Sequence, residues 1–125
     1  MSNLIIDTAG EKIFLKIIAE DKEYINKRDN CRENFDEIVN IIFNFLNKNN
    51  INLSKIENVF INQGPGKYTS IRSAISIAKA LKISRNVNIY GYYSTQINND
   101  NYDILMKLLK EGRLTKNFIQ PKYLN

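Results

Sequence analysis

The chain contains no histidine and only one cysteine, Cys31. Histidine is the commonest general base and the commonest metal ligand in proteins. Its absence excludes a Ser-His-Asp or Cys-His nucleophilic site, and a zinc site would depend on carboxylates and one thiol. A single cysteine also excludes an internal disulfide, which fits a reducing compartment.

Long apolar runs are missing as well. None approaches the roughly 20 residues that a membrane span needs. The first residues lead directly into Leu4-Ile5-Ile6-Asp7, with no basic segment before them, which favours a first strand over a secretory signal. The 125 residues suit one domain, so we expect a cytoplasmic, single-domain protein.

The chain carries 18 basic and 13 acidic side chains, a net charge of +5. An excess of positive charge can indicate a nucleic-acid surface. Here the lysines are scattered with carboxylates between them, and no basic stripe is interleaved with aromatic residues. Direct RNA binding by this chain alone is therefore the weaker hypothesis, with residues 107–122 as its only basic candidate segment.

Three strands joined by short turns are predicted at the start of the chain, over residues 4–7, 12–19 and 23–28. A helix follows, with Asn30 as its predicted N-cap and Glu33 completing a capping box. Its apolar stripe is Phe35, Ile38, Val39, Ile42, Phe45 and Leu46. Ile41 and Phe43 fall outside that stripe, which predicts that part of a second helix face is also covered.

The remaining pattern predicts a strand over 57–62, a helix over 68–81, a strand over 87–93 and a helix from a cap signal at 98–100 to Gly112. Residues 118–124 are either a last short strand or an extended end. The element order is β-β-β-α-β-α-β-α. It predicts an α/β fold with a mixed sheet of about five strands and helices packed on it.

The chain is organised around the turn Gly64-Pro65-Gly66, which joins a strand to a helix. Such a turn can hold an anion at the helix start or allow close backbone packing, and it can also be no more than a turn. A nucleotide P-loop is excluded because Ile61 replaces its first glycine and Tyr68 replaces its Ser or Thr.

The helix after this turn has two non-polar faces. One consists of Ile71, Ala74, Ile75, Ala78 and Leu81. The other consists of Ser73, Ile77 and Ala80, which are small enough for a neighbouring helix to approach closely. That neighbour belongs either to the same chain or to a partner.

Three segments together resemble the TsaB (YeaZ) family of the actin/Hsp70/sugar-kinase (ASKHA) superfamily. They are Ile6-Asp7-Thr8, the loop and helix Gly64-Pro65-Gly66-Lys67-Tyr68-Thr69-Ser70-Ile71-Arg72, and Ile89-Tyr90-Gly91-Tyr92-Tyr93-Ser94. The family motif reads Gly-Pro-Gly-Ser-Phe-Thr-Gly-Leu-Arg, so Lys67 and Ser70 depart from it. The resemblance covers residues 3–95.

The resemblance implies a single ASKHA lobe with a ribonuclease H-like fold over residues 1–97. Family members carry a second lobe of similar size, and residues 98–125 are expected to be its remnant. The resemblance also implies a motif loop made of Gly64, Pro65, Gly66, Thr69 and Arg72.

The family is a non-catalytic part of the bacterial machinery that makes threonylcarbamoyladenosine in tRNA. The resemblance therefore implies no catalytic residue, no metal and no cofactor in this chain. The implied partner is a TsaD-like catalytic subunit in a heterodimer, with TsaE as a further partner and tRNA bound only through the complex. The expected partner-binding residues are Ile41, Phe43, Ser73, Ile77 and Ala80.

Two other hypotheses stay open at this point. One is a small phosphotransferase or hydrolase that uses Asp7 and the Gly64–Gly66 loop, although Thr8-Ala9 departs from the superfamily's kinase loop. The plain alternative for Asp7 is a carboxylate that caps a turn. The other hypothesis is a homodimer formed through the same helix faces when no partner is present.

Overall fold

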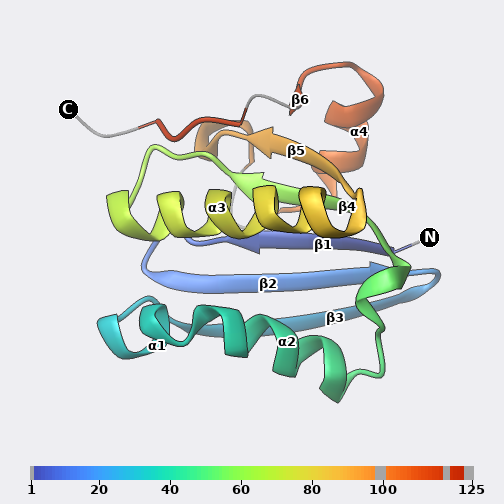
Figure 1. Ribbon diagram of the computed structural model, residues 1–125. Helices are drawn as coiled ribbons and strands as arrows, with labels where there is room; N and C mark the ends of the chain where they lie inside the picture. Colours follow the sequence, from blue (N-terminus) through green and yellow to red (C-terminus); the bar gives the residue numbers. More distant parts are fainter. Residues whose placement is uncertain (1, 98–100, 117–118, 123–125) are drawn as a thin grey trace.

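The computed structural model describes residues 2–97, 101–116 and 119–122, arranged as one mixed sheet with helices on both faces (Figure 1). The strand order is β3-β2-β1-β4-β5-β6. β1 pairs parallel with β4, and β4 with β5, whereas β1–β2, β2–β3 and β5–β6 are antiparallel. The strands are β1 (Ser2–Asp7), β2 (Lys12–Ala19), β3 (Lys22–Asp29), β4 (Ile56–Asn62), β5 (Asn88–Tyr92) and β6 (Thr115–Lys116).

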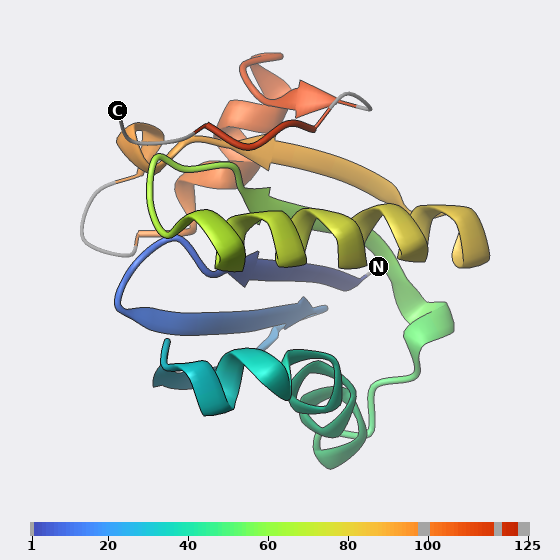
Figure 2. The same ribbon diagram turned by 60° about the vertical axis from the view of Figure 1, so that its left-hand side comes forward.

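The helices are unevenly shared between the two faces of the sheet. α2 and α3 lie on one face, and α4 lies on the other (Figures 1 and 2). No helix in the described part of the chain is long and apolar enough to cross a bilayer. The helices are α1 (Arg32–Asp36), α2 (Ile38–Lys48), α3 (Tyr68–Arg85) and α4 (Ile104–Lys110), with short 3₁₀ turns η1 (Leu53–Lys55) and η2 (Ser94–Gln96).

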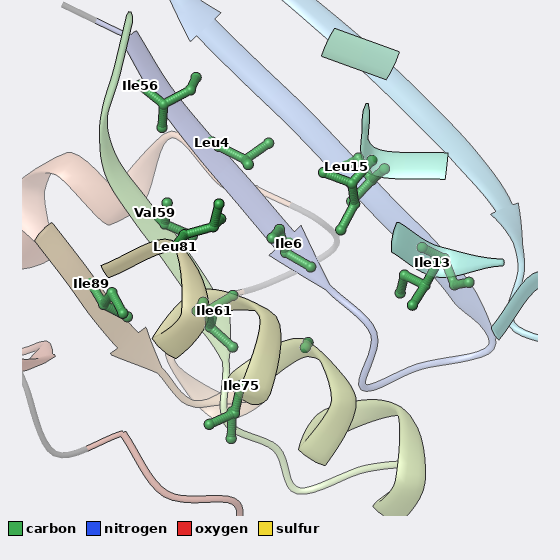
Figure 3. Packing of buried hydrophobic residues seen from close by; sticks show 14 of the residues in the cluster. Leu4, Ile6, Ile13, Leu15, Ile56, Val59, Ile61, Ile75, Leu81 and Ile89 are labelled. Carbon is green, nitrogen blue, oxygen red and sulfur yellow. The ribbon is translucent and has the colours of Figure 1, made fainter. Parts of the chain in front are cut away.

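Each face of the sheet has its own hydrophobic core because side chains alternate along the strands. Leu4 and Ile6 of β1 point into the larger core under α2 and α3 (Figure 3). Ile5, between them, points into the smaller core under α4. All six residues of β1 are buried, as expected for a central strand covered on both faces.

The predicted element order is confirmed, with two differences in the tail. The sheet has a sixth strand, β6, which pairs with β5. Of the two alternatives for residues 118–124, a last strand is wrong for the described residues 119–122, because these residues are not in a strand. The predicted cap at 98–100 lies outside the described residues. The division into 1–97 and 98–125 stays a prediction; α4 and β6 of the second segment pack on the same sheet as the first.

The predicted cap at Asn30 is wrong. α1 begins at Arg32, and no side chain caps it. The side-chain amide of Asn30 instead donates to the backbone oxygens of Thr8 and Gly10, both at 2.9 Å. Asn30 therefore ties the end of β3 to the connection between β1 and β2.

The predicted spare position of Ile41 is also wrong. Ile41 is 6% exposed and lies in the larger core, whereas Val39 is 48% exposed. The buried residues of α2 start at Ile38 and follow the spacing of one amphipathic face, Ile38, Ile41, Ile42, Phe45 and Leu46. At Glu37 the backbone leaves the helical conformation, which separates α1 from α2. An apolar stripe that is counted from Phe35 as if the two were one continuous helix therefore places the buried face incorrectly.

Candidate functional site

The parallel strands β1, β4 and β5 end at the same edge of the sheet. In open α/β sheets, ligands bind outside the carboxyl ends of such strands. Asp7 is the last residue of β1, Asn62 of β4 and Tyr92 of β5. This edge, with the Gly64–Gly66 loop beside it, is therefore the place to look for a site.

Both oxygens of the Asp7 carboxylate accept hydrogen bonds from the chain itself. Its Oδ1 accepts a hydrogen bond from the Ala9 backbone N–H at 3.1 Å. Its Oδ2 accepts from the Asn62 side-chain amide at 3.1 Å and from the hydroxyls of Tyr92 and Tyr102 at 2.9 Å each. Asp7 is 7% exposed. It therefore acts as a buried connector of β1, β4, β5 and the tail, and the plain turn-capping role covers only its bond to Ala9.

An open cavity of about 450 Å³ lies beside this carboxylate. Its walls include Phe14 and Tyr102, whose rings stack with centroids 4.3 Å apart. Lys12 and Lys27 are also at its walls. The hydrogen bond and the charge of Asp29 raise the pKa of Lys12, and Lys12 in turn lowers the pKa of Asp29. Within the described ranges, no group of three or more acidic, histidine or cysteine side chains could hold a metal ion.

The Gly64–Gly66 loop packs closely against other backbone. A Cβ on Gly66 would lie 2.2 Å from the Ala9 carbonyl oxygen, and the Lys67 N–H donates to that oxygen at 3.0 Å. The Gly64 N–H donates to the Asn62 side chain at 2.8 Å. Of the two roles that a Gly-Pro-Gly turn can have, the geometry supports close packing, because these N–H groups are directed at the chain itself.

The other side of the loop is held by Ser94 and by the tail. The Ser94 N–H donates to the Gly64 oxygen at 2.9 Å, and its hydroxyl donates to the Pro65 oxygen at 3.2 Å. The Lys122 N–H donates to the Gln63 oxygen at 2.7 Å. Gly64 has a φ of +102°, and a Cβ there would lie 2.4 Å from the Lys122 oxygen. Only glycine fits at this point.

The two departures from the family motif have a structural role. The Lys67 ammonium donates to the Asn30 backbone oxygen at 2.9 Å, and the Ser70 hydroxyl donates to the Asn30 side chain at 3.1 Å. The Ser70 backbone oxygen accepts from the Thr8 hydroxyl at 2.7 Å. Through Asn30, both side chains therefore fix the start of α3 to the end of β3, whereas the bond from Thr8 uses the backbone and does not depend on the departure. Thr69 and Arg72, the other predicted motif residues, lie on exposed positions of α3.

Sequence reasoning missed Tyr92, Tyr102, Asn30 and Gln63 as members of this network. Tyr92 and Tyr102 are fully or almost fully buried, and a buried tyrosine usually needs a partner for its hydroxyl. The sequence held a signal for Tyr92, because this residue lies at the carboxyl end of the strand after the one that ends in Asn62. It held none for Tyr102, whose position depends on the packing of α4.

The predicted partner-binding residues do not all reach the surface. Ile41 is in the core, Ile77 and Ser73 are half-buried, and Phe43 and Ala80 are exposed. Phe43 lines a surface depression of about 450 Å³ that also contains Arg85 of α3. The two exposed members of the predicted set, Phe43 and Ala80, thus lie on α2 and α3, which are on the same side of the sheet (Figure 2).

Residues 23–101 match the family model described as TsaD: tRNA N6-adenosine threonylcarbamoyltransferase. The chain belongs to this family. Among curated relatives, it is 31% identical over 100 residues to the tRNA threonylcarbamoyladenosine biosynthesis protein TsaB of Buchnera aphidicola subsp. Schizaphis graminum. It is 25% identical over 85 residues to TsaB of Buchnera aphidicola subsp. Baizongia pistaciae. The chain is thus a TsaB/YeaZ family member, as its motifs predicted.

The alignments cover 78% and 67% of this chain but 47% and 38% of the two TsaB proteins, so the chain spans about half their length or less. Solved structures agree on the fold. YeaZ from Pseudomonas aeruginosa has a TM-score of 0.68 at 17% identity, covering 74% of this chain and 45% of YeaZ. Thermus thermophilus RuvC, solved with a Holliday junction, has a TM-score of 0.57 at 13% identity and covers 93% of this chain and 99% of its own. The predicted ribonuclease H-like lobe is consistent with both.

Proposed function

We propose that the chain is a non-catalytic partner subunit for a TsaD-like enzyme in the formation of N6-threonylcarbamoyladenosine in tRNA. Two kinds of observation support this. The curated relatives are named as TsaB biosynthesis proteins. At the edge of the sheet where a ligand would be expected, the carboxylate of Asp7 already accepts four hydrogen bonds from the chain itself.

The observation that carries the non-catalytic part is the pair of tyrosine hydroxyls on Asp7. Tyr92 and Tyr102 both donate to Oδ2 at 2.9 Å. A metal ion or a phosphate-bound water that binds at Oδ2 would have to break both hydrogen bonds, and a hydrogen bond to a charged group contributes roughly 1.5–3 kcal/mol. The phosphotransferase hypothesis also needs a loop that presents N–H groups to an anion, and the N–H groups of Gly64 and Lys67 are engaged elsewhere.

The proposed docking face for the TsaD-like partner runs along α2 and α3. Phe43 is 40% exposed although it is aromatic, and aromatic side chains are enriched where proteins bind one another. Ser73, Ile77 and Ala80 of α3 give a flank of small and aliphatic groups. TsaE and tRNA would join only once the TsaD-like partner is bound. The same face could pair two copies in isolation.

The first experiment is co-expression of the full chain with the TsaD-like protein of the same genome, followed by co-purification. Phe43→Asp and Ala80→Asp should each lower the recovered complex at least tenfold, because a charge would be buried without a counterion at the interface. Ile77→Asp should do the same, with its melting temperature checked because Ile77 is half-buried. Thr95→Asp, an exposed position away from the helix face, is the matched control.

A second experiment asks whether the chain, with its TsaD-like partner, restores the modified nucleoside in cells that lack TsaB. Recovery of the nucleoside with the wild type, but not with Phe43→Asp, supports the proposal. A stable monomer that ignores the partner, or a complex that is insensitive to all three helix-face substitutions, would contradict the docking face. Tight magnesium-ATP binding in a calorimetric titration would contradict the non-catalytic role.

A further inference from the structure

β3 is the outermost strand of the sheet, and its outer edge has no neighbouring strand among the described residues. The strand is eight residues long, and its central residue Ile25 is 57% exposed. Open strand edges are templates for pairing with another chain. We propose that this edge pairs antiparallel with β3 of a second copy, around a twofold axis at Ile25.

The hairpin between β2 and β3 decides which backbone groups are available for this pairing. Ala19 and Lys22 are opposite one another across a two-residue turn. In such hairpins this pair is hydrogen-bonded, and hydrogen-bonded pairs recur at every second residue. The backbone groups of the even-numbered residues therefore point to β2. Those of Glu23, Ile25 and Lys27 point to the open edge.

The side chains of these three outward residues match one another in one antiparallel alignment. When Ile25 is opposite Ile25 of the second copy, Glu23 of each copy is opposite Lys27 of the other. Opposite charges and apolar pairs directly across two antiparallel strands are stabilising, and like charges are destabilising. The three pairs would add six backbone hydrogen bonds, two for each pair.

Neighbouring alignments are worse matched. Moving the twofold axis from Ile25 to Asn26 places Glu23 opposite Asp29. Moving the axis to Lys27 places Lys27 opposite Lys27 of the second copy, which is a like-charge pair. The alignment at Ile25 does leave one unfavourable pair, Lys22 opposite Arg28 on the other face of the sheet. Both are exposed and lie at the ends of the paired segment, where salt screens their repulsion.

The edge is separate from the helix face proposed for the TsaD-like partner. The proposed contact involves β3 and none of Phe43, Ser73, Ile77 or Ala80. Within one copy, Glu23 lies 3.5 Å from Lys16, and Lys27 lies over the Phe14 ring at 5.9 Å. Both contacts leave the strand's outer backbone edge open. The inference therefore stands or fails independently of the proposed function.

The first test is cross-linking of the full chain through Ile25→Cys in a Cys31→Ser background. Opposed residues of a hydrogen-bonded pair have Cα atoms about 5.5 Å apart, within the range of a disulfide. We expect a covalent dimer to form under mild oxidation. Ile83→Cys, at a position that is 87% exposed, and Phe43→Cys on the helix face are the controls. Equal rates of cross-linking for all three would overturn the proposal.

The second test uses charge reversal and mixing, measured by sedimentation velocity over a range of concentrations. Lys27→Glu and Glu23→Lys should each weaken self-association about tenfold, since every dimer then holds two like-charge pairs. An equimolar mixture of the two variants should associate as well as the wild type, because each Glu again faces a Lys. Circular dichroism checks that Glu23→Lys, which loses its contact with Lys16, is folded.

Arg28→Glu gives a change in the opposite direction. It replaces the Lys22–Arg28 repulsion by attraction and should strengthen self-association several-fold. A wild type that stays monomeric at all concentrations would overturn the proposal. So would a mixture of the two reversed variants that does not recover, which would place the contact elsewhere, including on the helix face.

Discussion

Replacing Asp7 by Asn separates a structural carboxylate from a catalytic one. In the wild type, Oδ2 accepts from three donors and Oδ1 accepts from the Ala9 N–H. An Asn side chain has one acceptor oxygen. If that oxygen takes the three-donor position, the new NH₂ group faces the Ala9 N–H; if the amide is turned around, NH₂ faces three donors. In either orientation, a buried N–H of the Asn side chain faces another donor, with no acceptor between them.

The expected cost can be worked from these contacts. The unpaired Ala9 N–H costs roughly 1–3 kcal/mol, and each of three bonds to a charged acceptor loses about 1 kcal/mol when the acceptor becomes neutral. Removing a buried charge offsets part of this loss. We expect the free energy of unfolding to fall by about 3 kcal/mol, a large share of the 5–15 kcal/mol typical of domains.

The assay is urea denaturation of purified protein, followed by circular dichroism. Tyr102→Phe removes one donor and should cost about 1.5–3 kcal/mol, the usual value for a bond to a charged group. Tyr24→Phe, at a half-buried position on β3, is the matched control and should cost much less. Catalytic groups are often replaced at a gain in stability. An Asp7→Asn protein that is as stable as the wild type, but does not restore the modified nucleoside together with the TsaD-like partner, would refute the structural assignment.

Three further predictions concern stability and binding. Gly66→Ala should lower the free energy of unfolding by at least about 2 kcal/mol, because its Cβ would meet a carbonyl at 2.2 Å, whereas Gly10→Ala, with nothing within 4 Å, should be within about 0.5 kcal/mol of wild type. Ile119→Ala should cost about 2–4 kcal/mol in thermal or urea unfolding, since Ile119 is 1% exposed in the larger core. Ile41→Ala should lower the free energy of unfolding by a similar amount and have little effect on partner binding. Phe43→Ala should weaken binding in a pull-down with the TsaD-like protein and have little effect on the free energy of unfolding. Equal effects of these two would contradict the corrected assignment of Ile41.

The sheet was largely predictable because its strands are local patterns. Short apolar runs rich in β-branched residues and bounded by turns predict a strand wherever its neighbours lie, and β1, β2 and β4 appear within a residue or two of their predicted limits. β6 was not predictable, since a two-residue strand such as Thr115–Lys116 has no pattern of its own and exists only because β5 offers an edge.

The site was predictable only in part. The turn Gly64-Pro65-Gly66 and Asp7 were visible because glycine, proline and a strand-ending carboxylate are informative by themselves. Their partners were not visible. Tyr102 reaches Asp7 across 95 positions of sequence, and Lys122 reaches the loop from the tail.

By itself, the sequence determined the order of strands and helices, the family and the place of the Gly64-Pro65-Gly66 turn, because these depend on local backbone preferences and short motifs. Tertiary structure alone decided that Asp7 is a buried connector, that Asn30 ties strands together, and that Ile41 is core while Phe43 is surface. Burial and hydrogen-bond partners depend on which distant segments meet, and a one-dimensional pattern does not contain that information until the sheet and its helices are assembled.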